Sequence, residues 1–127
     1  MATGLATATA NAFLDALCNA TSYSVTDVYI KLHVGDPGAS GTLNAATETT
    51  RKSASFSAAA SGAITNDAAL TWTTVAGTED YTHYTAWTAS SNGTFLFSGT
   101  VTANAVVAGD TFTIAIGDLD LSFTVAS

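Results

Sequence analysis

Few residues in this chain can carry acid–base or nucleophilic chemistry: two histidines, His33 and His83, the single cysteine Cys18, and ten carboxylates. A serine nucleophile needs a strained turn that exposes its hydroxyl, and the Gly-x-Ser-x-Gly sequence that builds such a turn does not occur. His83 stands between Thr82 and Tyr84 in an expected strand, which favours a partly buried imidazole hydrogen-bonded to a neighbour. The sequence therefore predicts no catalytic residues and no enzymatic activity.

The sequence contains no set of metal or cofactor ligands at a suitable spacing. His33 and His83 are about fifty residues apart and Cys18 is far from both, which does not fit a zinc site. Asp118 and Asp120 resemble a fragment of a calcium loop, but the twelve-residue ligand pattern that ends in Glu is missing. No glycine-rich phosphate loop occurs either. We expect no metal site and no cofactor.

The chain has three basic residues, and two of them are neighbours in the sequence. Arg51 and Lys52 follow a polar stretch, and Lys31 is the only other basic residue in a chain of net charge -7. The pair can be the solvated start of a strand, or an anchor whose cations fix the register on an acidic partner surface. Lys31, Arg51 and Lys52 are therefore the candidate interface residues.

The aromatic residues of the segment 81–87 have two possible uses. Period-two alternation places Tyr81, His83, Thr85 and Trp87 on one face of an expected strand. The aromatic rings can pack between two sheets. Alternatively Tyr81, Tyr84 or Trp87 can stack on a sugar, as in a carbohydrate-binding module.

Composition and charge exclude several classes of protein. Three basic residues against ten acidic ones cannot supply the cationic patch that nucleic acid or an anionic membrane surface requires. No run of residues approaches the about 20 apolar positions of a membrane span. The N-terminal residues do not resemble a secretory signal, and a lone cysteine cannot form a disulfide framework, which favours synthesis in a reducing cytoplasm. We expect no nucleic-acid or membrane partner.

One helix is expected near the start of the chain, at about residues 8–19. Its apolar residues recur at three- and four-residue spacing, as Phe13, Leu14, Leu17 and Cys18 show. Thr7 or Thr9 is expected to cap its N-terminus. Residues 1–10 are expected to form an N-terminal arm that packs on another chain.

Short strands are expected along the rest of the chain, because apolar and polar residues alternate with a period of two between glycine turns. The Asn92-Gly93 dipeptide predicts a type I′ hairpin turn. The expected strands cover about residues 27–34, 52–58, 70–74, 81–88, 94–97, 111–116 and 119–125. This pattern predicts a mainly β fold: a single antiparallel β-sandwich or jelly-roll-like domain over residues 1–127 with one short N-terminal helix.

About 70 of the 127 residues are Ala, Thr, Ser or Gly, so much of the surface must be small and neutral. Such faces suit repeated contact between protein copies, because few long side chains must be ordered and few charges desolvated. The composition therefore favours a structural or interaction role.

Motifs along nearly the whole chain resemble a family of small virion proteins of tailed bacteriophages. In the first half these are the segment 11–17, the strand 28–34 that runs into Gly-Asp-Pro, and Phe56-x-Ala-Ala followed by Gly62 and Asn66. In the second half they are Thr-His-Tyr-Thr-Ala-Trp at 82–87, the Asn-Gly hairpin into 95–99, Ala-Gly-Asp at 108–110, and Gly-x-Leu-x-Leu at 117–121.

The resemblance implies a non-enzymatic virion structural protein, in two versions. The first is a capsid decoration or minor capsid (cement) protein that binds the outer face of the major capsid lattice in many copies. The alternative is a tail-tip or tail-fibre-associated protein that contacts tail proteins and host carbohydrate. Both versions imply synthesis in the bacterial host cytoplasm and a homo-oligomer, either a trimer or a dimer.

Overall fold

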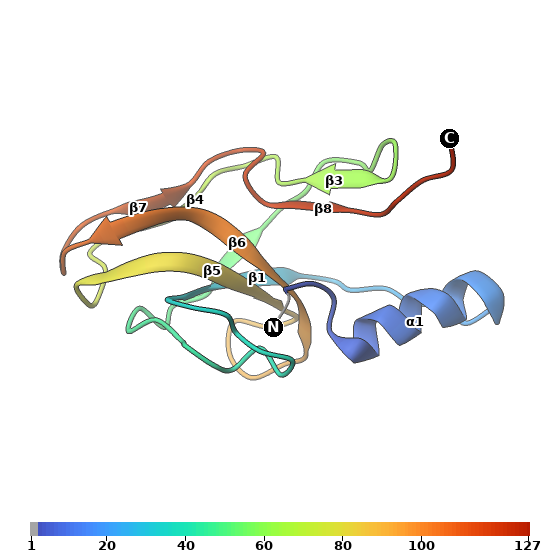
Figure 1. The fold of residues 1–127 in the computed structure, drawn as a ribbon, viewed down its shortest axis with the longest axis horizontal. Coiled ribbons are helices and arrows are strands. Elements are labelled where there is room, and N and C mark those ends of the chain that lie inside the picture. Colours follow the sequence, from blue (N-terminus) through green and yellow to red (C-terminus); the bar gives the residue numbers. More distant parts are fainter. Residues whose placement is uncertain (1–2) are drawn as a thin grey trace.

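The computed structural model describes residues 3–127, which form antiparallel strands with one N-terminal helix beside them (Figure 1). The elements are α1 (Thr7–Cys18), β1 (Val28–His33), β2 (Lys52–Ala54), β3 (Ala63–Thr65), β4 (Leu70–Trp72), β5 (Glu79–Trp87), β6 (Phe95–Val106), β7 (Phe112–Ile114) and β8 (Asp120–Ser122). The predicted fold class, mainly antiparallel β with one short N-terminal helix, is confirmed.

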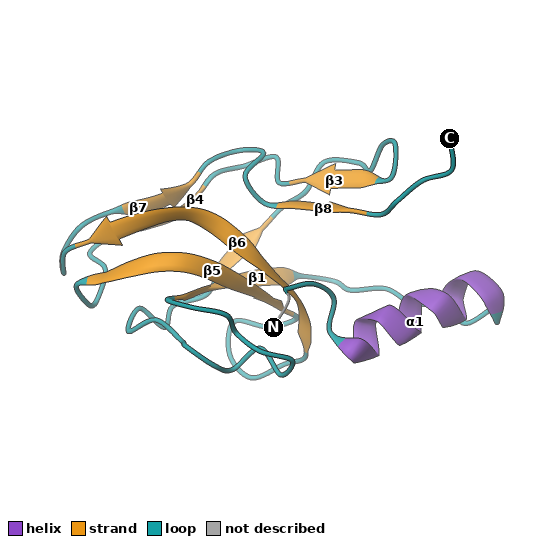
Figure 2. Ribbon diagram, viewed as in Figure 1, coloured by secondary structure: helices purple, strands orange, loops and turns teal. Residues whose placement is uncertain are grey.

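The strands form two layers. One layer is a four-stranded sheet in the order β2-β1-β5-β6, and the other consists of the two-stranded sheets β3-β8 and β4-β7. Figure 2 shows β4 and β7 lying over β6 and β5, with β3 and β8 continuing the second layer toward the C-terminus. The core fills the space between the layers, where alternate residues of β1, Ile30 and Leu32, are fully buried. Aromatic rings join the layers, since Phe112 of β7 packs 4.9 Å from Tyr81 of β5.

An irregularity in the pairing of β5 with β6 changes the face on which one predicted residue lies. The register with β6 shifts between Tyr81 and His83, so strict alternation breaks at that point. Tyr81 is fully buried and belongs to the core cluster together with Tyr84. The prediction that Tyr81 shares a face with His83, Thr85 and Trp87 is therefore wrong, because two steps along β5 face four steps along β6 at this point, and Tyr81 lies in the core with Tyr84.

The two positive φ angles predicted for the connection between β5 and β6 are confirmed, although residues 88–94 join the strands in place of a tight two-residue turn. Asn92 and Gly93 have φ values of 56° and 75°, the two positive angles that a type I′ turn requires. The Thr88 hydroxyl accepts a hydrogen bond from the Thr94 N–H at 2.9 Å and closes the hairpin.

Helix α1 begins without a side-chain cap. Its N-cap residue is Ala6, and no side chain accepts a hydrogen bond from the first turn. The prediction that Thr7 or Thr9 caps the helix is wrong, because both residues lie inside it. Thr9 is the only buried residue of the helix, and the last turn is exposed.

The chain before α1 runs along the edge of β6. The Gly4 carbonyl accepts a hydrogen bond from the Ser98 N–H at 2.8 Å, and the Ala6 N–H donates to the Leu96 carbonyl at 2.8 Å. Of the predicted arm, Met1 and Ala2 lie outside the described residues, and residues 7–10 belong to the helix. Contact between this segment and another chain stays a prediction.

The loop that joins β1 to β2 is fastened at residues 47–50 by two carboxylates. Glu79 accepts hydrogen bonds from the N–H groups of Thr47 at 2.9 Å and Glu48 at 3.2 Å. The buried Glu48 carboxylate accepts from the N–H groups of Ala76 and Thr50, both at 3.1 Å. These bonds hold a long polar loop in one position against the sheet.

Candidate functional site

A polar network lies on the face of the four-stranded sheet that points away from the core. His33 is fully buried there, with Nδ1 2.8 Å from the Leu43 carbonyl and Nε2 2.9 Å from the Thr85 hydroxyl. Because a carbonyl only accepts, Nδ1 carries the proton and Nε2 accepts from Thr85. The Thr85 oxygen in turn accepts from the Trp87 indole N–H at 2.7 Å. This arrangement is fully satisfied with a neutral His33, which gives the imidazole a structural role.

Burial lowers the pKa of His33, an effect that the hydrogen bond to Leu43 partly opposes. Since the unfolded histidine titrates near 6.5, the unfolded chain binds more protons than the folded one just below that pH. We expect the free energy of unfolding to fall as the pH drops below about 6.5, with a slope of up to about 1.4 kcal/mol per pH unit, and to level off below the folded pKa. Urea unfolding between pH 5 and pH 8 measures this slope.

His33→Gln and His83→Gln form a matched pair for that experiment. His83 is half-buried, and its Nδ1 lies 2.8 Å from the Thr82 hydroxyl, which confirms the predicted environment. His33→Gln should flatten the slope, whereas His83→Gln should keep it. An unchanged slope in His33→Gln would assign the pH dependence to another group.

The three predicted interface cations do not lie together. Arg51 donates from Nη1 to the carbonyls of Ala89 at 2.9 Å and Asn92 at 2.7 Å, and its guanidinium lies 4.4 Å from the centre of a Trp87 ring. Arg51 therefore braces the β5–β6 hairpin from the outer face of the sheet. Burial lowers the pKa of Lys31, and the charge of Arg51 lowers it further.

Lys52 lies on the opposite face. It pairs with Ile30 across β1 and β2, and directly opposed residues of a ladder project to the same side, which for Ile30 is the core side. The role of Lys31, Arg51 and Lys52 in pairing with partner carboxylates stays a prediction.

Two of the three aromatic residues considered for sugar binding are inaccessible. Tyr81 is 0% exposed and Tyr84 is 3% exposed, and burial raises the pKa of each to about 12. Trp87 is largely buried, and Arg51 lies over its ring. The interpretation of Tyr81 and Tyr84 as an exposed carbohydrate surface is wrong, and their use in packing between the layers is confirmed.

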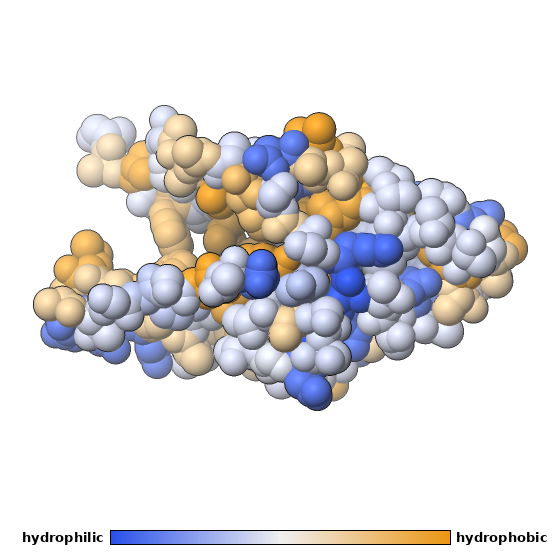
Figure 3. Space-filling model, turned by 180° about the vertical axis from the view of Figure 1, so that it is seen from behind, coloured by the Kyte–Doolittle hydropathy of each residue, from blue (hydrophilic) through white to orange (hydrophobic). Residues whose placement is uncertain are grey.

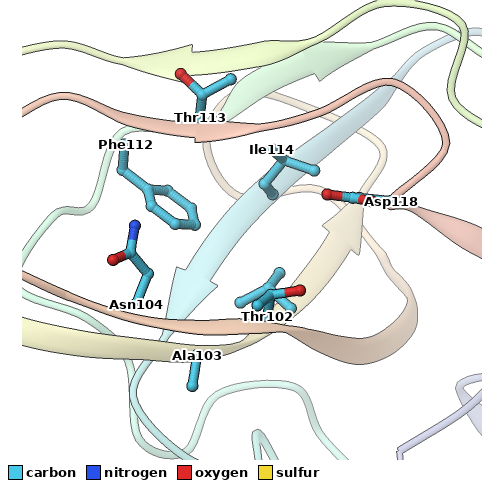
Figure 4. A pocket seen from close by; sticks show the side chains of 8 residues that line it. Thr102, Ala103, Asn104, Phe112, Thr113, Ile114 and Asp118 are labelled. Carbon is cyan, nitrogen blue, oxygen red and sulfur yellow. The ribbon is translucent and has the colours of Figure 1, made fainter.

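A polar cavity of about 360 Å³ opens between β6 and β7. Figure 4 shows Phe112, Asn104 and Thr102 directed into it, while Thr113 and Ala103 point away. Asp118 contributes the one ionisable side chain of the lining. The cavity therefore combines the Phe112 ring with the polar side chains of Thr102, Asn104 and Asp118.

An apolar groove separates α1 from the β3-β8 sheet and the chain that follows β8. Figure 3 shows it as a hollow with apolar residues between two projecting parts of the molecule. Adjoining cavities of about 230, 450 and 300 Å³ share Phe13, and two of them share Phe123. We define the apolar groove by its lining residues Phe13, Leu14, Leu17, Tyr23, Val25, Val28, Ile64, Leu121 and Phe123.

Sequence reasoning missed this groove although it identified both of its sides. Leu14 and Leu17 belong to the predicted apolar stripe of the helix, and Phe123 belongs to the predicted face of the last strand. These three side chains are 60%, 80% and 55% exposed. An apolar stripe predicts burial, but whether this chain supplies the covering surface depends on tertiary structure.

Within residues 3–127, no group of three or more His, Cys, Asp or Glu side chains is placed to hold a metal ion. Nor does the described part of the chain contain a helix with the length and apolar character that crossing a membrane requires.

Comparison with known proteins relates this chain to bacteriophage fibres. A search of curated proteins found no match. A family model described as Podophage GP4 fiber I protein gp80 matches residues 4–122, which include every strand and the helix. Because the match covers nearly the whole chain, the protein belongs to this fibre protein family, which confirms the resemblance to virion structural proteins of tailed phages.

Proposed function

We propose that this protein is a non-enzymatic structural subunit of a phage tail fibre that acts through protein–protein contacts. The observation that carries the proposal is the match of a fibre family model along residues 4–122. The exposed apolar groove supports it, because apolar patches of this kind mark sites where another protein binds. The largely neutral surface supports it too, since such surfaces associate without desolvating charges.

Family membership supports the tail-fibre alternative better than capsid decoration, which was the leading interpretation of the sequence. The proposed partners are accordingly tail proteins and further copies of this chain rather than the major capsid protein. The proposed location is the tail fibre of the virion.

Gold-labelled antibodies raised against the purified protein test this location on intact phage particles. We expect gold at the tail fibres and none above background on the capsid, with an antibody against the major capsid protein as the positive control for head labelling. Gold spread evenly over the capsid faces would overturn the tail proposal and restore the decoration interpretation.

A further inference from the structure

Helix α1 has too few contacts within the described chain to account for its own stability. It has 12 residues, no side-chain cap, no acidic residue in its first turn and no basic residue in its last turn. Isolated helices of about this length are marginal in water, so they depend on the packing of an apolar face. Phe13 supplies such packing, with its ring 5.5 Å from Tyr23 and 5.8 Å from Phe123. The two leucines of the following turn have no comparable cover, because Leu14 and Leu17 are 60% and 80% exposed.

The opposite wall of the apolar groove is held in place by the chain itself. The Phe123 N–H donates to the Gly62 carbonyl at 2.8 Å, and the side chain of Val125 lies against Gly62, where a Cβ atom would collide with it. Gly62 has a φ of 78°, so its conformation also favours glycine. The groove is therefore preformed between two walls rather than opened by a ligand.

The exposed area at the groove is sufficient for a specific protein interface. Leu14, Leu17, Tyr23 and Phe123 of the groove, and Val125 next to it, are between 38% and 80% exposed. Since a large apolar side chain offers about 150–250 Å², these five expose on the order of 500 Å² in total. Two such patches that face each other bury about 1,000 Å², which is the size at which specific association becomes feasible.

The exposed area fits a second copy of this chain as the occupant, and the uncharged lining lets two acidic copies meet there. Every lining residue of the groove is uncharged, so the groove does not select a cationic or an anionic partner. Copies that each carry a net charge of -7 repel one another, and contact through an uncharged patch keeps most carboxylates away from the interface. Leu14 and Leu17, three residues apart on α1, lie beside Phe13 and Phe123 on the same surface, so two copies that face each other cover these leucines mutually.

We propose that the apolar groove binds helix α1 of a second copy of this chain, with Leu14 and Leu17 of that copy inserted beside Phe13 and Phe123. This self-association rests on the proposed function, which names further copies of this chain as partners, and it identifies the surface through which they bind. It is tested on the purified chain, so its failure would leave the proposed tail-fibre location standing.

Sedimentation of the purified protein at concentrations between about 1 and 100 µM tests the proposal. This concentration range covers dissociation constants in the micromolar range. We expect the wild type to form dimers or trimers in this range and Leu17→Asp to weaken the association at least tenfold. Val107→Asp is the matched control, since Val107 is 60% exposed but lies beyond β6, outside the groove. A monomeric wild type at the highest concentration, or equal weakening by both variants, would overturn the proposal.

The native cysteine gives a second measurement that does not rely on a variant. Cys18 is exposed and lies four residues after Leu14, on the same side of the helix. Its reaction with a maleimide should slow several-fold as wild-type protein is concentrated, and should keep a constant rate in Leu17→Asp. A rate in the wild type that does not depend on protein concentration would contradict burial of this helix face.

Discussion

Replacement of Asn66 by alanine is expected to lower the free energy of unfolding by about 3 kcal/mol, a large share of the 5–15 kcal/mol typical of a domain. Asn66 is 1% exposed. Its Oδ1 accepts from the N–H groups of Gly117 and Leu119, both at 3.0 Å. Its Nδ2 donates to the carbonyls of Ala68 at 2.9 Å and Ala115 at 3.1 Å. One side chain thus joins the segment before β4 to the turn between β7 and β8.

The four groups that bond to the Asn66 side chain contribute unequally to the stability lost in Asn66→Ala. The Gly117 N–H keeps the Asn66 backbone carbonyl as an acceptor, and the Ala115 carbonyl keeps the Asp118 N–H as a donor. The N–H of Leu119, a residue that is 1% exposed, loses its acceptor, and a buried unpaired N–H costs about 1–3 kcal/mol. The remainder of the expected loss comes from the ordinary net value of the other bonds.

Urea unfolding followed by tryptophan fluorescence measures the effect of Asn66→Ala, with Asn104→Ala as the control. Asn104 is exposed beside the cavity between β6 and β7, so its truncation should change stability by no more than about 0.5 kcal/mol. Asn66→Asp should also destabilise at neutral pH, because the carboxylate oxygen that replaces Nδ2 would face two carbonyl oxygens. If Asn66→Ala were as mild as Asn104→Ala, the network would have no structural importance.

Features of the fold that depend on local chemistry were predictable from the sequence. The two positive φ angles between β5 and β6 follow from Asn92 and Gly93 alone, because few residues other than these adopt two consecutive positive φ angles. The strand 28–33 follows from the alternation of Ile30 and Leu32 with polar neighbours. In both cases the information lies within a few adjacent residues.

Features that depend on distant pairing were not predictable. Strand β3 has three residues and pairs with 120–122, more than fifty positions away, so no local pattern distinguishes it from a loop. The inward position of Tyr81 depends on the irregular register of β5 with β6. The cation at Arg51 was visible in the sequence, but its position over Trp87 results from the way the β1–β2 loop crosses the sheet.

The distinction between local and long-range features also applies to the candidate site. The sequence has few groups that could catalyse a reaction and many small, neutral side chains, which favours a contact role, and the fibre family match supports that role. The apolar groove was not predictable, because the apolar stripes that line it have the same periodicity as stripes that face the core of a protein. Sequence periodicity identifies which side chains avoid water, but the tertiary structure decides whether this chain or another one covers them.

Replacement of Trp72 by alanine is expected to cost about 3–5 kcal/mol, the usual range for removing a fully buried tryptophan. Trp72 is 1% exposed on β4, and its ring lies 5.9 Å from Phe112 of β7. Its indole N–H donates to the Thr50 carbonyl at 2.8 Å. Trp72 therefore fills the core of the second layer and fastens the end of the β1–β2 loop, so its loss leaves a cavity and frees the loop.

Trp72→Phe separates these two contributions, because phenylalanine keeps most of the ring volume and removes only the N–H donor. We expect about 1–2 kcal/mol for this variant, since the Thr50 carbonyl lies at an exposed residue where water can replace the indole. Urea unfolding measures both variants, with Trp87 retained as the fluorescent probe. Amide exchange at Thr47 and Thr50 should quicken in both, and equal losses of stability in the two variants would show that the hydrogen bond outweighs the packing.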